Sequence, residues 1–159
     1  MQKIVASHID EYGDEPVSCV SVPARFHLLG EHTWFAHGNT LSMAINANLQ
    51  LCISKRQDTN FRFFSISLSE RRRVSVANLK YRKEDRWANS LKAVVASFYD
   101  HGYDIPGLNF TISSDIPANA GLGTPNALKV ATALAISRLV CKRISNVEVL
   151  EIVEHANVE

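Results

Sequence analysis

Residues 41–53 read LSMAINANLQLCI, and apolar side chains alternate with polar or small ones along the whole stretch. A strict period of two places one set of side chains on each face of a β-strand. The stretch therefore predicts a long strand, bent or straight, that buries one face in a core. Residues 61–68 and 74–79 continue the pattern, and the apolar run 17–22 predicts a strand that ends at Pro23. We expect the first part of the chain to form an antiparallel sheet.

The hydrophobic period changes after residue 89. Four apolar side chains there fall at positions i, i+3, i+4 and i+7, which is the stripe of an amphipathic helix. They are Leu91, Val94, Val95 and Phe98. We expect this helix to end near residues 101–102, where a glycine follows a histidine. The alternation at residues 108–113 then predicts another strand.

Two further helices are expected in the last third of the chain. Residues 126–140 are apolar on nearly every face, which predicts a helix buried between layers. Thr124 is the expected N-cap of this helix, and Pro125 suits its first position. Residues 145–148 have a capping-box pattern that begins the last helix. From its length, the chain is expected to form one domain, residues 1–159, or a piece of a larger one.

The composition is that of an ordinary globular protein. Hydrophobic residues make up 46% of the 159 residues and charged residues 21%, which excludes a disordered tail. The formal net charge of +1 gives no field that would gather nucleic acid or anionic membrane, so neither is expected as a partner. The basic run at residues 71–73 is interpreted as a solvated turn between two strands. An α/β nucleic-acid-binding domain, as in ribosomal proteins, is the weakest alternative considered.

The three cysteines are Cys19, Cys52 and Cys141, each inside an apolar stretch. They form no CxxC motif and have no histidine at metal-ligand spacing. We expect buried free thiols in a reducing cytoplasm. The N-terminal segment lacks the apolar core of a signal peptide and no run reaches the length of a membrane span, so a cytoplasmic location is expected.

Residues 117–124, with the sequence PANAGLGT, join a predicted strand to the start of a predicted helix. Two glycines allow a close turn, and a helix N-terminus presents unpaired N–H groups and the positive end of the helix dipole. This geometry suits a phosphate group. The segment is not a Walker A loop, because no Gly-Lys-Ser/Thr follows.

Four segments together resemble the galactokinases. They are PARFHLLGEHT at 23–33, RWAN at 86–89, the loop at 117–124 and EHA at 154–156. Their order and approximate spacing are similar to those of this family within the GHMP small-molecule kinases, and the GEHT segment is specific to galactokinase-like members. The resemblance implies an α+β fold, the GHMP kinase N-terminal domain, which is ribosomal protein S5 domain 2-like, with a mixed sheet packed against helices and the C-terminal domain absent.

The resemblance also implies a sugar site. Arg25 matches the arginine that steadies the sugar hydroxyl and the developing charge, which makes it the candidate catalytic residue. Glu31 and His32 match residues that bind sugar hydroxyls. A neutral polyol needs donors and acceptors fixed in position, and a cation beside the attacking oxygen lowers the cost of its deprotonation.

A nucleotide site is implied in the same way. The loop residues Gly121, Leu122, Gly123 and Thr124 would wrap the phosphates of ATP, and Trp87 would contact adenine with its flat apolar face. Thr124 with its hydroxyl, and Glu154 from the last helix, are the expected Mg²⁺ ligands. The implied cofactors are therefore ATP and Mg²⁺.

The sequence departs from the family pattern in three places. Trp34 and Phe35 stand where the signature has Asp-Tyr, so one acidic sugar ligand is missing at a cost of roughly 1–3 kcal/mol. His27 replaces an asparagine. In the phosphate loop, Pro125 offers neither a hydroxyl for Mg²⁺ nor an N–H for a phosphate oxygen.

Two main hypotheses follow. The first is the N-terminal part of a galactokinase-like sugar kinase, inactive alone because the family's catalytic aspartate and C-terminal domain would lie beyond Glu159. The second is a non-catalytic GHMP-like binding or regulatory domain with degenerate sites, alone or paired with a separately made second half. Sugar and ATP are the expected ligands, and self-association is expected if the faces that contact a second domain are exposed.

Overall fold

The computed structural model describes residues 1–32, 34–140 and 144–156. In this part of the chain a five-stranded sheet has the order β1-β2-β5-β3-β4. The strands are β1 (Ser18–Leu29), β2 (Leu41–Lys55), β3 (Asn60–Ser65), β4 (Glu70–Ser75) and β5 (Leu108–Ser114). The helices are α1 (Gln2–Tyr12), α2 (Ala88–Asp100), α3 (Thr124–Ser137) and α4 (Asn146–His155), and short 3₁₀ turns are η1 (Trp34–Ala36), η2 (Val76–Asn78) and η3 (Lys83–Asp85).

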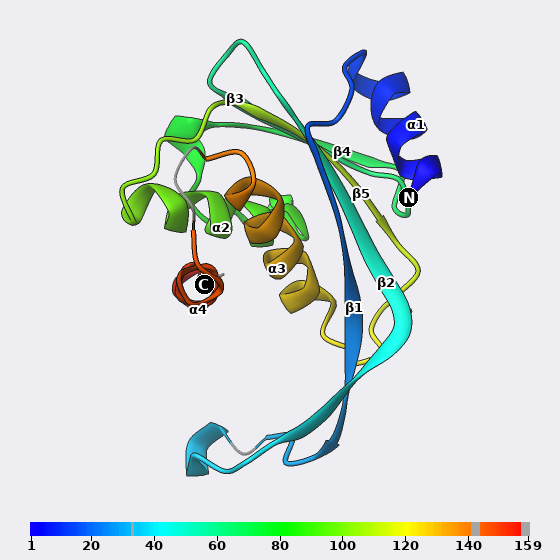
Figure 1. The fold of residues 1–159 in the computed structure, drawn as a ribbon, viewed down its shortest axis with the longest axis vertical. Helices are drawn as coiled ribbons and strands as arrows, with labels where there is room; N and C mark the ends of the chain where they lie inside the picture. The colour runs from blue at the N-terminus through cyan, green and yellow to red at the C-terminus, as the bar shows by residue number, and fades with distance from the viewer. Residues whose placement is uncertain (33, 141–143, 157–159) are drawn as a thin grey trace.

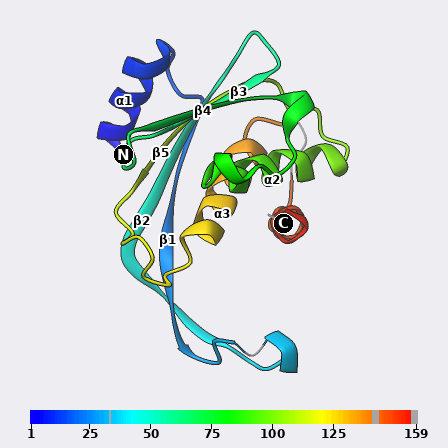
Figure 2. The same ribbon diagram turned by 180° about the vertical axis from the view of Figure 1, so that it is seen from behind.

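The sheet is mixed, and the helices lie on both of its faces. Helices α2, α3 and α4 lie together on one face, and α1 lies on the other (Figures 1 and 2). Strand β3 pairs with β4 in antiparallel fashion but with β5 in parallel fashion. The α+β fold with a mixed sheet is therefore confirmed. The first part of the chain was expected to form one antiparallel sheet, and this is wrong in one respect. Strand β5 lies between β2 and β3, so β2 and β3 do not pair with each other, and β3 pairs with β5 in parallel.

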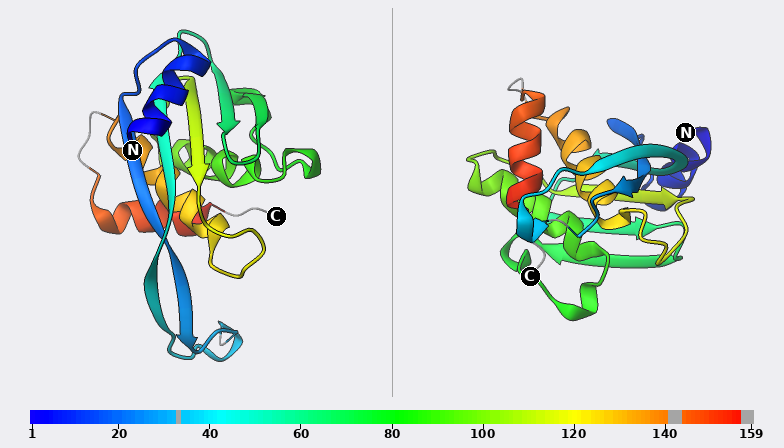
Figure 3. Two further views of the ribbon diagram at one scale, coloured as in Figure 1. Left: turned by 90° about the vertical axis from the view of Figure 1, so that its right-hand side faces the viewer. Right: turned by 90° about the horizontal axis from the view of Figure 1, so that it is seen from below.

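Strand β2 confirms the period-two prediction, but only its second half is in the core. Leu49, Leu51 and Ile53 are fully buried against the helical layer, whereas Leu41 and Met43 are 53% and 48% exposed. The first half of β2 pairs with the end of β1 in a hairpin arm, residues 26–44, that projects beyond the helices (Figure 3). Alternation predicts which side chains share a face, but it does not predict whether another layer covers that face.

Two expectations about β1 and β4 are wrong. Strand β1 does not end at Pro23 but continues to Leu29, and the register shifts between Pro23 and Arg25. Because β1 is an edge strand, the missing N–H of a proline is tolerated there. The basic run 71–73 lies within β4, also an edge strand, and not in a turn. There Arg71 forms a bidentate ion pair with Glu11 of α1, at 2.6 and 2.7 Å.

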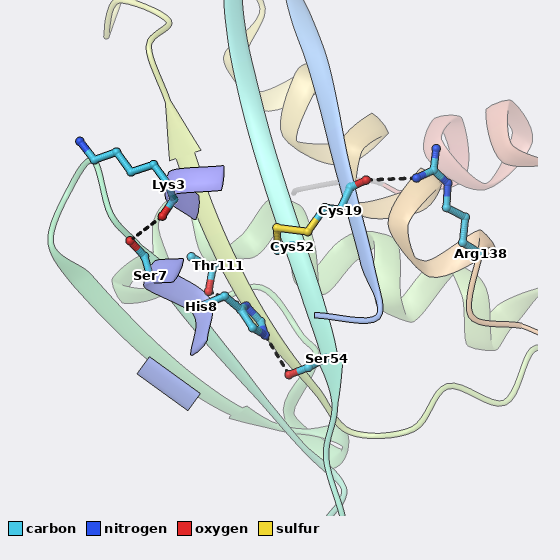
Figure 4. Close-up of a disulfide and its surroundings, with 8 residues drawn as sticks. All are labelled: Lys3, Ser7, His8, Cys19, Cys52, Ser54, Thr111 and Arg138. Atoms are coloured by element: carbon cyan, nitrogen blue, oxygen red, sulfur yellow. Dashed lines mark hydrogen bonds between the residues drawn. A yellow bond between two sulfur atoms is a disulfide. The ribbon is translucent and has the colours of Figure 1, made fainter. Parts of the chain in front are cut away.

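Helix α1 was not predicted, and a buried histidine connects it to the sheet. His8 Nδ1 lies 2.8 Å from Thr111 Oγ1, and Nε2 lies 2.9 Å from Ser54 Oγ (Figure 4). The side chain is fully buried, and burial lowers its pKa from 6.5 to about 4. The imidazole is therefore neutral at neutral pH, with one nitrogen donating and the other accepting.

The cysteine expectation is corrected as well. Cys19 and Cys52 are directly opposed in the β1–β2 pairing, with their Cα atoms 4.2 Å apart, and they form a disulfide (Figure 4). Arg138, the residue after α3, donates to the carbonyl oxygen of Cys19 at 3.1 Å. The expectation of free thiols rested on sequence spacing, which says nothing about strand register. Cys141 lies outside the described residues.

The disulfide predicts a defined thiol count. When the chain is purified without reductant and denatured with iodoacetamide, mass spectrometry should show one alkylated cysteine of the three, and three after reduction. The bond links residues 33 apart, so the double variant Cys19→Ser/Cys52→Ser should lower the free energy of unfolding by about 4 kcal/mol through the lost chain constraint. Three alkylated cysteines before reduction would contradict the pairing.

His8 predicts a specific loss of stability in acid. Between pH 6.5 and about 4 the unfolded chain binds a proton at His8 that the folded chain does not, so this histidine lowers stability as the pH falls through that window. Melting temperatures measured from pH 7 to pH 4.5 should therefore fall more steeply for the unaltered chain than for His8→Asn. The exposed His37→Asn variant serves as control, and parallel curves for the unaltered chain and His8→Asn would contradict the assignment.

Candidate functional site

The glycine loop, residues 117–124, connects β5 to α3. Gly121 and Gly123 have φ angles of 70° and 76°, in the left-handed region that glycine adopts without strain. Gly123 is the N-cap of α3 and Thr124 is its first residue, so Thr124 is not the N-cap as expected. The reason is that the left-handed turn at Gly123 places the helix start one residue earlier.

The start of α3 presents backbone N–H groups at the loop. Ala127 N donates to Gly123 O at 2.9 Å, which closes the first helical turn. Of the residues inside that turn, Thr124 and Asn126 have N–H groups that the helix itself does not use, and Pro125 has none. The loop therefore retains the features that suit an anion, with one donor fewer than a loop without proline.

Arg25 lies against this loop. Its backbone N–H donates to Leu122 O at 3.2 Å, which joins β1 to the loop. A Cβ atom added to Gly123 would lie 3.1 Å from Arg25 Nε and 3.2 Å from Cγ, so the arginine side chain occupies the space that a larger residue would need. The structure thus brings the candidate catalytic cation into contact with the candidate phosphate loop, although about 100 residues separate them in the sequence.

A pocket of about 480 Å³ lies beside the loop. Its walls come from β2, β3, β5, the β3–β4 turn and the starts of α2 and α3, and most of the lining is apolar. Trp87, at the start of α2, lines this pocket together with Gly121, Leu122, Gly123 and Thr124. All five residues expected to bind the nucleotide therefore surround one cavity. An apolar pocket beside a phosphate-type loop has the shape and chemistry that a nucleotide requires.

The position of Trp87 depends on a carboxylate that the sequence did not indicate. Trp87 Nε1 donates to Glu70 Oε2 at 2.9 Å, and its ring packs edge-on against Phe63 with centroids 6.5 Å apart. Glu70 also pairs with Arg86 at 3.2 Å and with Arg72 at 3.3 Å. No sequence signal identifies Glu70, because it begins a strand 17 residues before Trp87 and stands beside a basic run.

Glu31 and His32 do not line the pocket; they lie in the turn that follows β1, which ends at Leu29. Their side chains are 65% and 85% exposed, and 3.8 Å separates Glu31 Oε1 from His32 Nε2. The turn itself is tight, because a Cβ atom on Gly30 would lie 2.3 Å from Asn39 O. Within the described residues, the sugar-binding candidates of the tip are therefore not brought together with Arg25.

Two of the departures from the family pattern lie on the same arm. His27 Nδ1 is 2.7 Å from Ser42 Oγ, a cross-strand contact between β1 and β2 that occupies this ring nitrogen. Phe35 is 71% exposed. Trp34 belongs to η1, but its side chain and the whole of Thr33 lie outside the described residues.

Glu154 is exposed near the end of α4 and does not line the pocket. A hydrogen bond nevertheless connects α3 to the residue that follows α4. Lys129 Nζ donates to Ala156 O at 2.6 Å, and burial lowers the pKa of this lysine. Half of the expected capping box of α4 is confirmed, since Ser145 Oγ accepts from Glu148 N at 3.2 Å, whereas the Glu148 carboxylate accepts from the Tyr103 hydroxyl.

The described residues contain no group of three or more histidine, cysteine or acidic side chains placed to hold a metal ion. The fit for ATP is good, with a glycine cradle, a cation and an apolar pocket in one place. The fit for Mg²⁺ is limited to the hydroxyl of Thr124 at the loop, which matches an ion that keeps its waters and binds mainly to substrate phosphates. In the described part of the chain, no helix is both long and apolar enough to cross a membrane.

Comparison with known proteins identifies the family. The description "Galactokinase galactose-binding signature" matches residues 6–55, and "GHMP kinases N terminal domain" matches residues 89–159. A Treponema pallidum protein named "Putative galactokinase" is 61% identical over 157 residues, covering 99% of this chain and 40% of that protein. A galactokinase of Thermotoga maritima is 34% identical over 140 residues, covering 88% of this chain and 38% of the relative.

A solved structure gives the same result for the fold. The Lactococcus lactis galactokinase complexed with galactose superposes with a TM-score of 0.84 at 19% identity, over 98% of this chain and 41% of that one. The chain thus spans about two fifths of the length of the relatives that it matches. It belongs to the galactokinase-like members of the GHMP kinase superfamily and corresponds to their N-terminal portion.

Proposed function

We propose that this chain supplies the ATP site and part of the sugar site of an ATP-dependent galactokinase. The whole protein would transfer the γ-phosphoryl group of Mg-ATP to the C1 hydroxyl of galactose. The observation that carries the proposal is the contact of Arg25 with the glycine loop, whose residues 121–124 line the same pocket as Trp87. A cation beside a phosphate loop is where a phosphoryl transfer needs charge stabilisation.

In this proposal each candidate residue has a defined task. The pocket beside Trp87 takes the base, and the backbone at residues 121–124 surrounds the phosphates. Thr124 would offer its hydroxyl to Mg²⁺, and Glu154 of α4 would be the acidic residue that holds the ion. Mg²⁺ would neutralise negative charge on the β- and γ-phosphates. Arg25 would stabilise the negative charge shared by the attacking oxygen and the γ-phosphoryl group.

The sugar would bind along the hairpin arm, between Arg25 and the tip. The galactose-binding signature covers the whole arm, which supports this placement. Glu31 would accept hydrogen bonds from sugar hydroxyls, and His32 would donate or accept according to its tautomer. Because the tip lies apart from Arg25, the site would close only with a further part of the protein. A partner for the exposed arm would therefore be either a C-terminal portion or a second copy of the chain.

A second candidate function is a non-catalytic binding domain. It is favoured by Pro125, which removes one N–H from the start of α3, where a phosphate would otherwise find three donors in succession. This domain would retain the fold and a weakened pocket, and it would act through binding alone.

The purified chain should bind Mg-ATP and should form no galactose 1-phosphate, because only part of the sugar site is present. Isothermal titration calorimetry with Mg-ATP and with galactose, together with a phosphorus NMR assay of the reaction mixture, checks both statements. Tight binding of both ligands would exclude the degenerate, weakened sites on which the non-catalytic alternative rests. Binding of neither would exclude the kinase, and product formation would overturn the prediction of inactivity.

Gly123→Ala should weaken Mg-ATP binding by about tenfold. The backbone at this position has a positive φ, which strains a residue with a Cβ atom, and the added Cβ atom would displace Arg25. Gly102→Ala is the matched control, because Gly102 also has a positive φ but has open space around its Cα. The two variants should lose similar thermal stability from backbone strain, whereas only Gly123→Ala should lose affinity. Equal affinities for the two variants would show that the loop does not contact the nucleotide.

A further inference from the structure

Glu70 occupies an unusual position for a charged residue of an edge strand. It is the first residue of β4, paired with Ser65 of β3, and it follows the turn at residues 66–69. Ser65, Ser67 and Leu68 of this turn region line the pocket that also contains Trp87. The Glu70 side chain is only 26% exposed, so its carboxylate is directed toward the start of α2 rather than into bulk solvent.

Three donors converge on this carboxylate. Oε2 accepts from Trp87 Nε1 at 2.9 Å and from Arg72 Nη2 at 3.3 Å, and Oε1 accepts from Arg86 Nη1 at 3.2 Å. Two of the donors come from the segment before α2 and one comes from β4 itself. An ionised acceptor makes each of these hydrogen bonds stronger than a neutral one would be.

The backbone beside Trp87 needs this support. Arg86 has a φ of 45° and a ψ of −116°, which is a costly conformation for a residue with a Cβ atom. Asn89 holds the same segment, because its Oδ1 accepts from Arg82 N at 3.1 Å and its Nδ2 donates to Arg86 O at 3.2 Å. Asn89 fixes the main chain of the turn, whereas Glu70 is bonded to the indole ring.

We infer that Glu70 is a positioning residue, which orients the indole of Trp87 in the pocket so that its face is presented to the base of a bound nucleotide. This inference rests on the proposed nucleotide site. The indole has a single N–H donor, and bonding it to a fixed acceptor leaves the ring little freedom to rotate. The T-shaped contact with Phe63 and the hydrogen bond to Glu70 together restrict the orientation of the indole ring.

The chain has two tryptophans, Trp34 and Trp87. Every variant in the test also carries Trp34→Phe, so that all tryptophan fluorescence comes from Trp87. Glu70→Ala removes the acceptor, and Glu70→Gln keeps a carbonyl oxygen for the indole while removing the charge. Glu11→Gln is the matched control, since Glu11 also pairs with an arginine of β4 but lies on the far face of the sheet. Acrylamide quenching of Trp87 fluorescence and Mg-ATP affinity are measured for each variant.

In Glu70→Ala we expect stronger quenching of Trp87 and about tenfold weaker Mg-ATP binding, from the loss of one charged hydrogen bond. Glu70→Gln should restore both values to within a few-fold, and Glu11→Gln should change neither. Unchanged quenching in Glu70→Ala would overturn the inference, and so would increased quenching with unchanged affinity. If the unaltered chain binds no Mg-ATP, the proposed function fails, while the quenching data still decide whether Glu70 orients Trp87.

Discussion

The antiparallel pairing of β1 with β2 is the constraint on which the other features of the chain depend. A β-ladder fixes which residues oppose one another, and a slip of one residue would turn every side chain to the other face. The observed register opposes Cys19 and Cys52, continues past Pro23 with a shift, and then places Arg25 opposite Ala44. The same pairing extends the two strands beyond the helical layer as the arm.

The candidate site arises where this hairpin meets the start of α3. Gly123 is needed there for two independent reasons, a left-handed backbone and the space that Arg25 occupies. The loop is also tied to β1 through the hydrogen bond from Arg25 N to Leu122 O. Cation, phosphate-type loop and apolar pocket are therefore connected by one set of contacts, whereas Glu31 and His32 lie in the turn after β1 and do not line the pocket.

Prediction from the sequence succeeded where local periodicity carries the information. Residues 41–53, the helix α2 and the capped helix α4 follow from side-chain spacing within a few residues. Prediction failed at Pro23 and in the basic run 71–73, because edge strands tolerate a proline and exposed charges that a central strand would exclude. For the site, the motifs indicated Arg25 and the loop, and the structure brings them together.

By itself, the sequence determined the period-two strand β2, the glycine loop and the N-cap of α4 at Ser145, since each depends on residues close together in the chain. Only the tertiary structure decided the Cys19–Cys52 disulfide, the burial of His8 and the bond from Trp87 to Glu70. These contacts join residues 17 to 103 positions apart. Sheet register and helix packing decide which of these distant residues come into contact, and local patterns of side chains do not predict these contacts.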